Sequence, residues 1–275
     1  MTRVFLTLVL AGSIPLLLEA QGTAVADCSG LVARAFEAAG VNDEIAAIPA
    51  QIQSQFSTQL RLDANQNDSK MSGAEKQRFE AAMTQAFLPA TIDRELKREF
   101  LEPCDPGMLR SVIAGLTNPL GDRMRKLEAF AESPAARQEG EAYAHTLAQR
   151  PPARERVMSM LRMDASLGLT KSTMDITLAS ARGIAAAFGG LPADGSAEAA
   201  LQSKQTSDAM HGAVLVNLLF TYRDVSDQDL TSYIELYETP AFVSFNDRLE
   251  KALIACIKGR SEALGQEIRK MMPAR

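Results

Sequence analysis

The sequence has no tryptophan, and aromatic residues make up only 5% of its 275 positions. A β-sandwich usually takes much of its core from aromatic and β-branched side chains. Alanine and leucine are abundant here instead, and both favour helices. The composition therefore favours a helical core of small and aliphatic side chains over an aromatic-rich sandwich.

Long runs of one charge are also missing, and the net charge is −5. A protein that binds nucleic acid usually carries a basic stripe that neutralises phosphates, and an anionic membrane likewise attracts basic segments. We therefore expect neither a nucleic-acid partner nor an anionic membrane surface as a partner.

Histidine and cysteine are scarce: His145 and His211 are isolated, and no C-x-x-C pair is present. Zinc sites need several such ligands at short spacings, so we expect no metal and no cofactor. The motifs of serine hydrolases, zinc proteases and phosphate-binding loops are missing as well. His211 lies near Ser207 and Asp208 on one predicted helix, where a surface hydrogen bond is the expected role. No catalytic residue is predicted.

The first 26 residues have the composition of a secretory signal peptide. Arg3 is followed by an apolar run over 4–18, and Ala24 and Ala26 precede Asp27, which predicts cleavage after Ala26. The alternative is an uncleaved membrane anchor, for which the apolar run is short. We expect export, and no stable membrane insertion once the signal is removed.

Export makes the three cysteines informative, because secreted thiols can be oxidised. An odd number allows at most one internal disulfide. Cys256 lies on the apolar stripe of its predicted helix and is expected to be a buried thiol. Cys28 and Cys104 each precede a predicted helix, so we expect a disulfide between them.

Beyond the signal, nearly every segment has apolar residues at helical spacing and is bounded by Asp, Asn, Ser, Gly or Pro. The predicted fold class is all-α. The predicted helices span 29–39, 42–58, 72–87, 90–102, 106–117, 119–132, 134–149, 152–167, 171–188, 197–221, 227–238 and 240–272.

A shift of 121 positions, the separation of Pro119 from Pro240, aligns two predicted helix corners. Proline suits the first helical position, where its missing N–H costs nothing. The paired apolar positions are Leu109 with Leu230, Val112 with Tyr233, Ile113 with Ile234, and Leu116 with Tyr237. The paired residues expected to cap a helix start are Asp105 with Ser226, and Asn118 with Thr239.

This alignment predicts two tandem helical repeats, 27–150 and 151–275, packed into one body. Consecutive prolines, Pro151 and Pro152, mark the division. The alternative is that both corners use the residues that any tight helix–helix connection uses.

The second corner, DVSDQDLTSYIELYETPAFVSFN, resembles the C-terminal motif of a bacterial exported family, the domain-of-unknown-function family twenty fifty-nine. The matching residues are Ser226, Asp229, Leu230, Ile234, Tyr237, Thr239 and Pro240. Phe242 replaces the family's glycine, which the first corner keeps as Gly121. The resemblance implies an all-helical periplasmic domain, and it supplies no catalytic or ligand-binding residue.

Four aromatic residues, Tyr233, Tyr237, Phe242 and Phe245, surround the second corner. They could form a partner or ligand surface for a peptide or lipid tail, or fill the space between two helices that meet at an angle. Filling the space is the interpretation that we favour.

The first functional hypothesis is a non-catalytic periplasmic module that binds an envelope protein or peptide. The alternatives are a carrier of a hydrophobic ligand between the repeats and a hydrolase with an unrecognised site. A carrier needs an apolar cavity of roughly several hundred Å³, an enzyme needs convergent polar groups with shifted pKa values, and a partner-binding module needs an exposed apolar patch.

Overall fold

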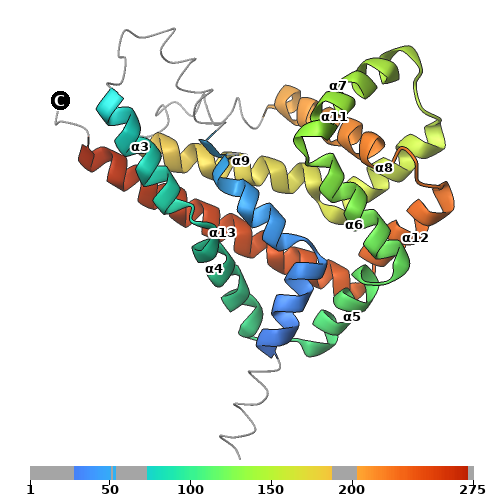
Figure 1. The fold of residues 1–275 in the computed structure, drawn as a ribbon, viewed down its shortest axis with the longest axis horizontal. Coiled ribbons are helices and arrows are strands. Elements are labelled where there is room, and N and C mark those ends of the chain that lie inside the picture. Colours follow the sequence, from blue (N-terminus) through green and yellow to red (C-terminus); the bar gives the residue numbers. More distant parts are fainter. Residues whose placement is uncertain (1–27, 51, 54–72, 188–202, 272–275) are drawn as a thin grey trace, which may run out of the picture.

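The computed structural model describes residues 28–50, 52–53, 73–187 and 203–271 (Figure 1). Within these ranges the regular structure is entirely α-helical, with no strand, so the predicted all-α class is confirmed. The predicted signal peptide, residues 1–26, lies outside the described residues. No helix in the described ranges is long and apolar enough to cross a membrane.

The described helices begin with two N-terminal segments, 28–38 and 41–50. The elements that follow are α3 (Gly73–Ala86), α4 (Pro89–Leu101), α5 (Pro106–Leu116), α6 (Pro119–Ala131), α7 (Pro134–Gln149), α8 (Arg154–Leu167), α9 (Leu169–Ala187), α11 (Lys204–Thr221), α12 (Asp227–Tyr237) and α13 (Pro240–Met271).

Where both ends are described, these bounds lie close to the predicted ones, with one clear exception. The sequence predicts an unbroken helix over 197–221, but α11 begins at Lys204. Ser203 has an extended backbone, and its side chain accepts a hydrogen bond from the Thr206 N–H. Ser203 is therefore an N-cap that starts the helix, and residues 197–202 lie outside the described residues.

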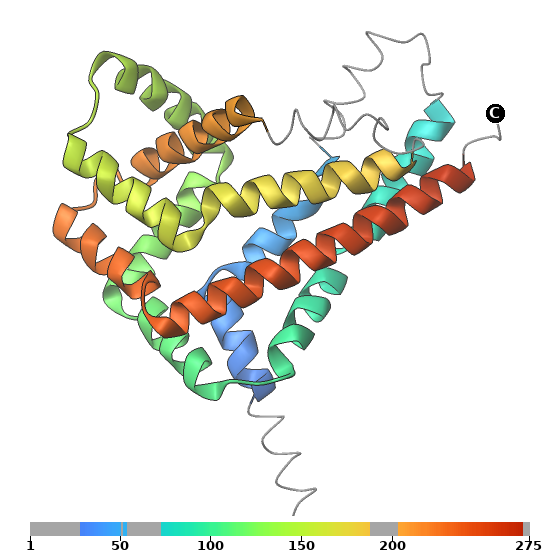
Figure 2. The ribbon, with the colours of Figure 1, turned by 180° about the vertical axis from the view of Figure 1, so that it is seen from behind.

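The C-terminal helix α13 brings the two halves of the chain together. It makes its most extensive contact with α9 and also packs against α3, α4 and α5 (Figures 1 and 2). Phe36, from the first segment, packs edge-to-face on Phe100 of α4 and Phe245 of α13, with ring centroids 5.2 and 6.3 Å away. Buried residues of both halves belong to one hydrophobic core.

Cys28 and Cys104 form the predicted disulfide, which ties the first helical segment to the residues just before α5. Cys256 is free and buried on α13, as predicted. Its thiol donates a hydrogen bond to Glu95 Oε2, 3.1 Å away. Burial, reinforced by Glu95, raises the pKa of this thiol to about 11, so it stays protonated and poorly reactive.

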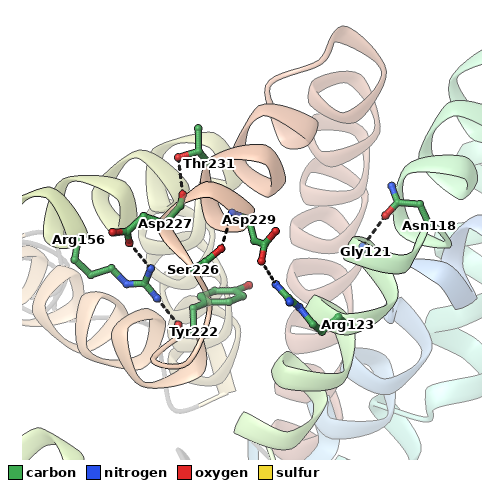
Figure 3. A network of polar contacts seen from close by, with 9 residues as sticks. All are labelled: Asn118, Gly121, Arg123, Arg156, Tyr222, Ser226, Asp227, Asp229 and Thr231. Carbon is green, nitrogen blue, oxygen red and sulfur yellow. Dashed lines mark hydrogen bonds and ion pairs between the residues drawn. The ribbon is translucent and has the colours of Figure 1, made fainter.

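The two helix corners have the same bounds under the 121-position shift, since α5 aligns with α12 and both prolines begin a helix. Three of the four predicted caps are confirmed: Asp105, Asn118 and Ser226 accept hydrogen bonds from backbone N–H groups three residues later (Figure 3 shows the last two). Thr239 differs, because its hydroxyl donates to the Leu236 carbonyl at the end of α12. The same carbonyl also accepts from the Thr239 N–H, 3.2 Å away.

The match under the 121-position shift does not extend beyond the two corners to the whole of 27–150 and 151–275. Ser133 and Pro134 separate α6 from α7, while the corresponding Ile254 and Ala255 lie within the continuous α13. Neither residue interrupts a helix as proline does. The packing of 27–150 and 151–275 as tandem repeats therefore stays a prediction.

Gly121 shows why the first corner is tight. A Cβ atom at this position would lie 2.6 Å from the carbonyl oxygens of Gly115 and Leu116. Phe242 occupies the equivalent place in the second corner, where its ring is buried next to Gly115. A large apolar side chain therefore enters the interior where the first corner has none.

Candidate functional site

A cavity of about 330 Å³ lies where the segment 41–50 meets α6, α9, α11, α12 and α13. Apolar side chains make up much of its lining, among them Val41, Leu116, Leu169, Leu218, Phe242 and Leu249. The ionisable and amide groups that share the lining are Glu44, Arg125, Glu128, Glu132, Asn217, Tyr222, Tyr237 and Asn246.

Glu128 is the centre of the polar part of the cavity. Its Oε2 accepts a 2.6 Å hydrogen bond from Arg125 Nη1 one helical turn away. Its Oε1 accepts from the Tyr222 hydroxyl at 2.6 Å and from the Tyr233 hydroxyl at 2.8 Å. Hydrogen bonds to a charged acceptor are short and strong, so this carboxylate joins α6 to α11 and α12.

The tyrosines around Glu128 remain protonated donors. Burial is the main reason that the pKa values of Tyr222, Tyr233 and Tyr237 lie well above the ordinary value, and the Glu128 charge raises them further. The hydroxyls of Tyr233 and Tyr237 lie 3.0 Å apart, and their rings pack edge-to-face.

Arg125 is held against the turn that joins the two N-terminal segments. Gly40 in this turn has φ +69°, a left-handed conformation that glycine adopts without strain. A Cβ atom on Gly40 would lie 1.3 Å from Arg125 Nη2, so any side chain there would displace the guanidinium. Gly40 thus serves both the turn and the position of Arg125.

Glu44 and Glu132 are the other two carboxylates of the cavity. Neither side-chain carboxylate makes a hydrogen bond or an ion pair with another residue in the described part of the chain. Glu44 and Glu132 are both solvent-exposed residues, and both line the cavity. Burial raises the pKa of Glu44 from 4.5 to about 7, with Arg125 opposing and Glu132 and Glu128 adding to the rise. Burial also raises the pKa of Glu132.

Asn246 extends from α13 into the same lining. Its Nδ2 atom is buried and has no hydrogen-bond partner in the described chain. An amide donor in this state costs free energy until it meets an acceptor.

Polar contacts outside the cavity hold Tyr222 in place (Figure 3). Arg156 of α8 donates to the Tyr222 carbonyl and forms a 2.7 Å ion pair with Asp227 at the start of α12. Arg123 of α6 forms a 2.7 Å ion pair with Asp229 of α12. The loop before α12 is therefore anchored to both α8 and α6.

The four aromatic residues predicted as a partner or ligand surface are all buried. They present no outer face to a partner protein. Tyr237, Phe242 and Phe245 instead line the cavity, and Tyr233 donates to Glu128.

Sequence reasoning missed the charged residues of the cavity. Arg125, Glu128 and Glu132 lie on one face of α6, at spacings of three and four. This spacing is the only signal that the sequence contained, and it is a weak one because exposed helix faces carry the same pattern.

His211 has a different partner from the expected one. Its Nδ1 lies 3.2 Å from Asp164 Oδ2 of α8, and Asp164 also accepts from the N–H and hydroxyl of Thr170. Asp208 pairs instead with Lys204. A separate groove of about 410 Å³ borders Asp164, but His211 does not line it. The contacts of Asp164 and His211 join α8, α9 and α11.

Within the described ranges, no three His, Cys, Asp or Glu side chains are grouped so that they could hold a metal ion. No protein-family model matches the sequence, and neither a curated protein nor a solved structure shows significant similarity to it. The resemblance of the second corner to the exported helical family stays a prediction.

Proposed function

We propose that this chain is an exported helical protein whose body binds a small, largely apolar organic molecule in the central cavity. The observation that carries the proposal is the cavity itself. Its volume of about 330 Å³ falls within the range of small-molecule sites, which are typically apolar with a few placed polar groups. Of the functions that the sequence left open, this one corresponds to the carrier of a hydrophobic ligand.

Two features support export. The first 26 residues have the composition of a signal peptide, and a disulfide such as Cys28–Cys104 is typical of proteins in oxidising compartments. If the full chain is produced in a bacterium with an intact export pathway, we expect it in the periplasm with Asp27 as its first residue. N-terminal sequencing of the periplasmic fraction tests this, and an uncleaved chain in the membrane fraction would contradict it.

An envelope protein or peptide as partner stays a prediction. The large apolar side chains that are exposed in the described chain are Phe130, Met158 and Val243, one each on α6, α8 and α13. The cavity offers the more specific site, and the ligand-binding proposal therefore comes first.

Fluorescence of N-phenyl-1-naphthylamine, an uncharged probe near neutral pH, tests ligand binding. Val214 of α11 lines the cavity, and Val214→Phe places a ring in that space. Val243→Phe makes the same change on an exposed valine of α13. We expect the wild type and Val243→Phe to bind the probe equally, and Val214→Phe to bind it at least about tenfold more weakly, since the lost apolar contact is worth more than about 1.4 kcal/mol.

Circular dichroism shows whether each variant is folded, and Leu249→Phe, which changes another lining residue, serves as a second filled variant. Equal probe binding by folded Val214→Phe, folded Leu249→Phe and the wild type would contradict the proposal, as would a wild type that does not bind the probe.

A further inference from the structure

The charges around the cavity are unequal. Among the described residues that line it, Arg125 is the only cation, and Glu44, Glu128 and Glu132 are the carboxylates. Arg125 forms its ion pair with Glu128, 2.6 Å away. The positive charge of Arg125 is therefore already paired with a carboxylate of the protein.

Both carboxylate oxygens of Glu128 already accept hydrogen bonds from the protein. Oε2 accepts a hydrogen bond from Arg125, and Oε1 accepts from the hydroxyls of Tyr222 and Tyr233. The side-chain carboxylates of Glu44 and Glu132, by contrast, form no hydrogen bond or ion pair with any residue that the structure describes. The two carboxylates that face the cavity are thus available to a bound molecule.

Glu44 and Glu132 are solvent-exposed residues that lie beside apolar side chains of the cavity, and an opposite charge would stabilise their ionised forms. The pKa values of Glu44 and Glu132 are raised, mainly by burial. A cation would lower these pKa values, whereas an anionic ligand would be repelled by both groups. A metal ion fits poorly, because no metal-binding group of side chains occurs in the described ranges.

We infer that the ligand is an amphipathic organic ammonium compound. Glu44 and Glu132 bind its positive charge, and the apolar residues of α9, α11 and α13 contact its hydrocarbon part. This inference rests on the proposed function, because it names the class of ligand that the same cavity binds.

Three ligands with one hydrocarbon chain and different head groups test the charge preference: octylammonium, 1-octanol and octanoate. Each is titrated by isothermal calorimetry, and against bound N-phenyl-1-naphthylamine, at about pH 8, above the pKa of about 7 of Glu44. We expect octylammonium to bind at least about tenfold more tightly than 1-octanol, as one favourable charge contact permits, and octanoate to bind most weakly.

The double variant Glu44→Gln, Glu132→Gln removes both charges with little change of shape. It should lose the preference for octylammonium over 1-octanol, measured as the ratio of the two affinities in the same variant. The control is Glu141→Gln, the same change on an exposed residue of α7, and it should keep the preference.

The outcomes separate the two proposals. If the wild type binds N-phenyl-1-naphthylamine but binds 1-octanol or octanoate as tightly as octylammonium, the charge inference is wrong and the apolar binding function stands. A preference that survives in the double variant also overturns the inference. If neither the probe nor octylammonium binds, both proposals are wrong.

Discussion

The Tyr222 hydroxyl donates a 2.6 Å hydrogen bond to Glu128 Oε1 and so joins the end of α11 to α6 at the cavity. The Tyr233 hydroxyl donates to the same oxygen from α12. α6 is therefore joined to the distant pair α11 and α12 through one carboxylate, whose side chain is only 19% exposed. Removing either donor leaves a partly buried charge with fewer partners.

Tyr222→Phe is therefore expected to lower the free energy of unfolding by about 1–3 kcal/mol, the range for a buried group that loses a partner. Urea denaturation followed by circular dichroism measures the change. Tyr143→Phe is the matched control, since the Tyr143 hydroxyl makes no hydrogen bond in the described ranges, and its effect should stay within about 0.5 kcal/mol. Equal losses in the two variants would show that the bond to Glu128 contributes nothing.

The raised pKa of Glu44 predicts a pH dependence of stability. In the folded protein Glu44 holds its proton up to a pKa of about 7, while the unfolded chain releases it near 4.5. Between these values the folded state binds more protons, so the free energy of unfolding falls as pH rises from about 5 to about 7. Glu132, whose pKa is also raised, acts in the same direction.

The charged and titratable groups around Glu44 are Asp43 on its own segment, Arg125, Glu128 and Glu132 from α6, and Tyr237 of α12. Comparing Glu44→Gln with the wild type isolates the contribution of Glu44 from theirs. We expect little difference at pH 5, and a variant that is more stable by about 1 kcal/mol at pH 8, a modest figure because solvent reaches this side chain. A stability difference that is constant across this pH range would contradict the assignment.

Gly121→Ala tests the close approach of α5 and α6. Its Cβ would lie 2.6 Å from two backbone carbonyl oxygens, and relieving such a contact typically costs about 1–3 kcal/mol. Gly212→Ala makes the same change on α11, where nothing lies within 4 Å, and alanine should stabilise that helix by up to about 1 kcal/mol. The thermal unfolding temperature should therefore fall for Gly121→Ala and rise for Gly212→Ala. A Gly121→Ala variant as stable as the wild type would contradict the close contact between α5 and α6.

The Cys28–Cys104 bond closes a separation of 76 residues, so its loss should lower the free energy of unfolding by about 4 kcal/mol through the entropy of the unfolded chain. The double variant Cys28→Ser, Cys104→Ser, compared with the wild type in urea, measures the effect. Non-reducing peptide mapping of the exported protein should join Cys28 to Cys104 and leave Cys256 free. A bridge that includes Cys256 would contradict the fold, because that thiol lies buried on α13.

Most of the helix boundaries could be predicted because their causes are local. Asp105, Asn118 and Ser226 each cap a helix through an N–H group three residues later, and a proline opens α6 and α13. The errors have local causes too. Ser203 and Thr239 have hydroxyls that can accept from a helix start or donate to a helix end, and the sequence does not say which.

The disulfide could be anticipated from export and from the positions of Cys28 and Cys104 at helix ends, with Cys256 assigned to an apolar stripe. The aromatic cluster at the second corner was also recognisable. Its location in the cavity lining was not, because whether Phe242 faces solvent or the interior depends on what α5 places opposite it, and that neighbour is Gly115.

By itself, then, the sequence determined the helical class, most helix ends and the two matching corners, since side-chain periodicity, capping and proline act within about one helical turn. Only the tertiary structure decided the site. Glu44, Tyr222 and Asn246 come from three separate parts of the chain, and Arg125 and Glu128 come from α6. What each does depends on desolvation and on charges across space. Packing α13 against the first half of the chain brings these side chains around one cavity, and that packing leaves Glu44 and Glu132 facing it without a partner in the described chain.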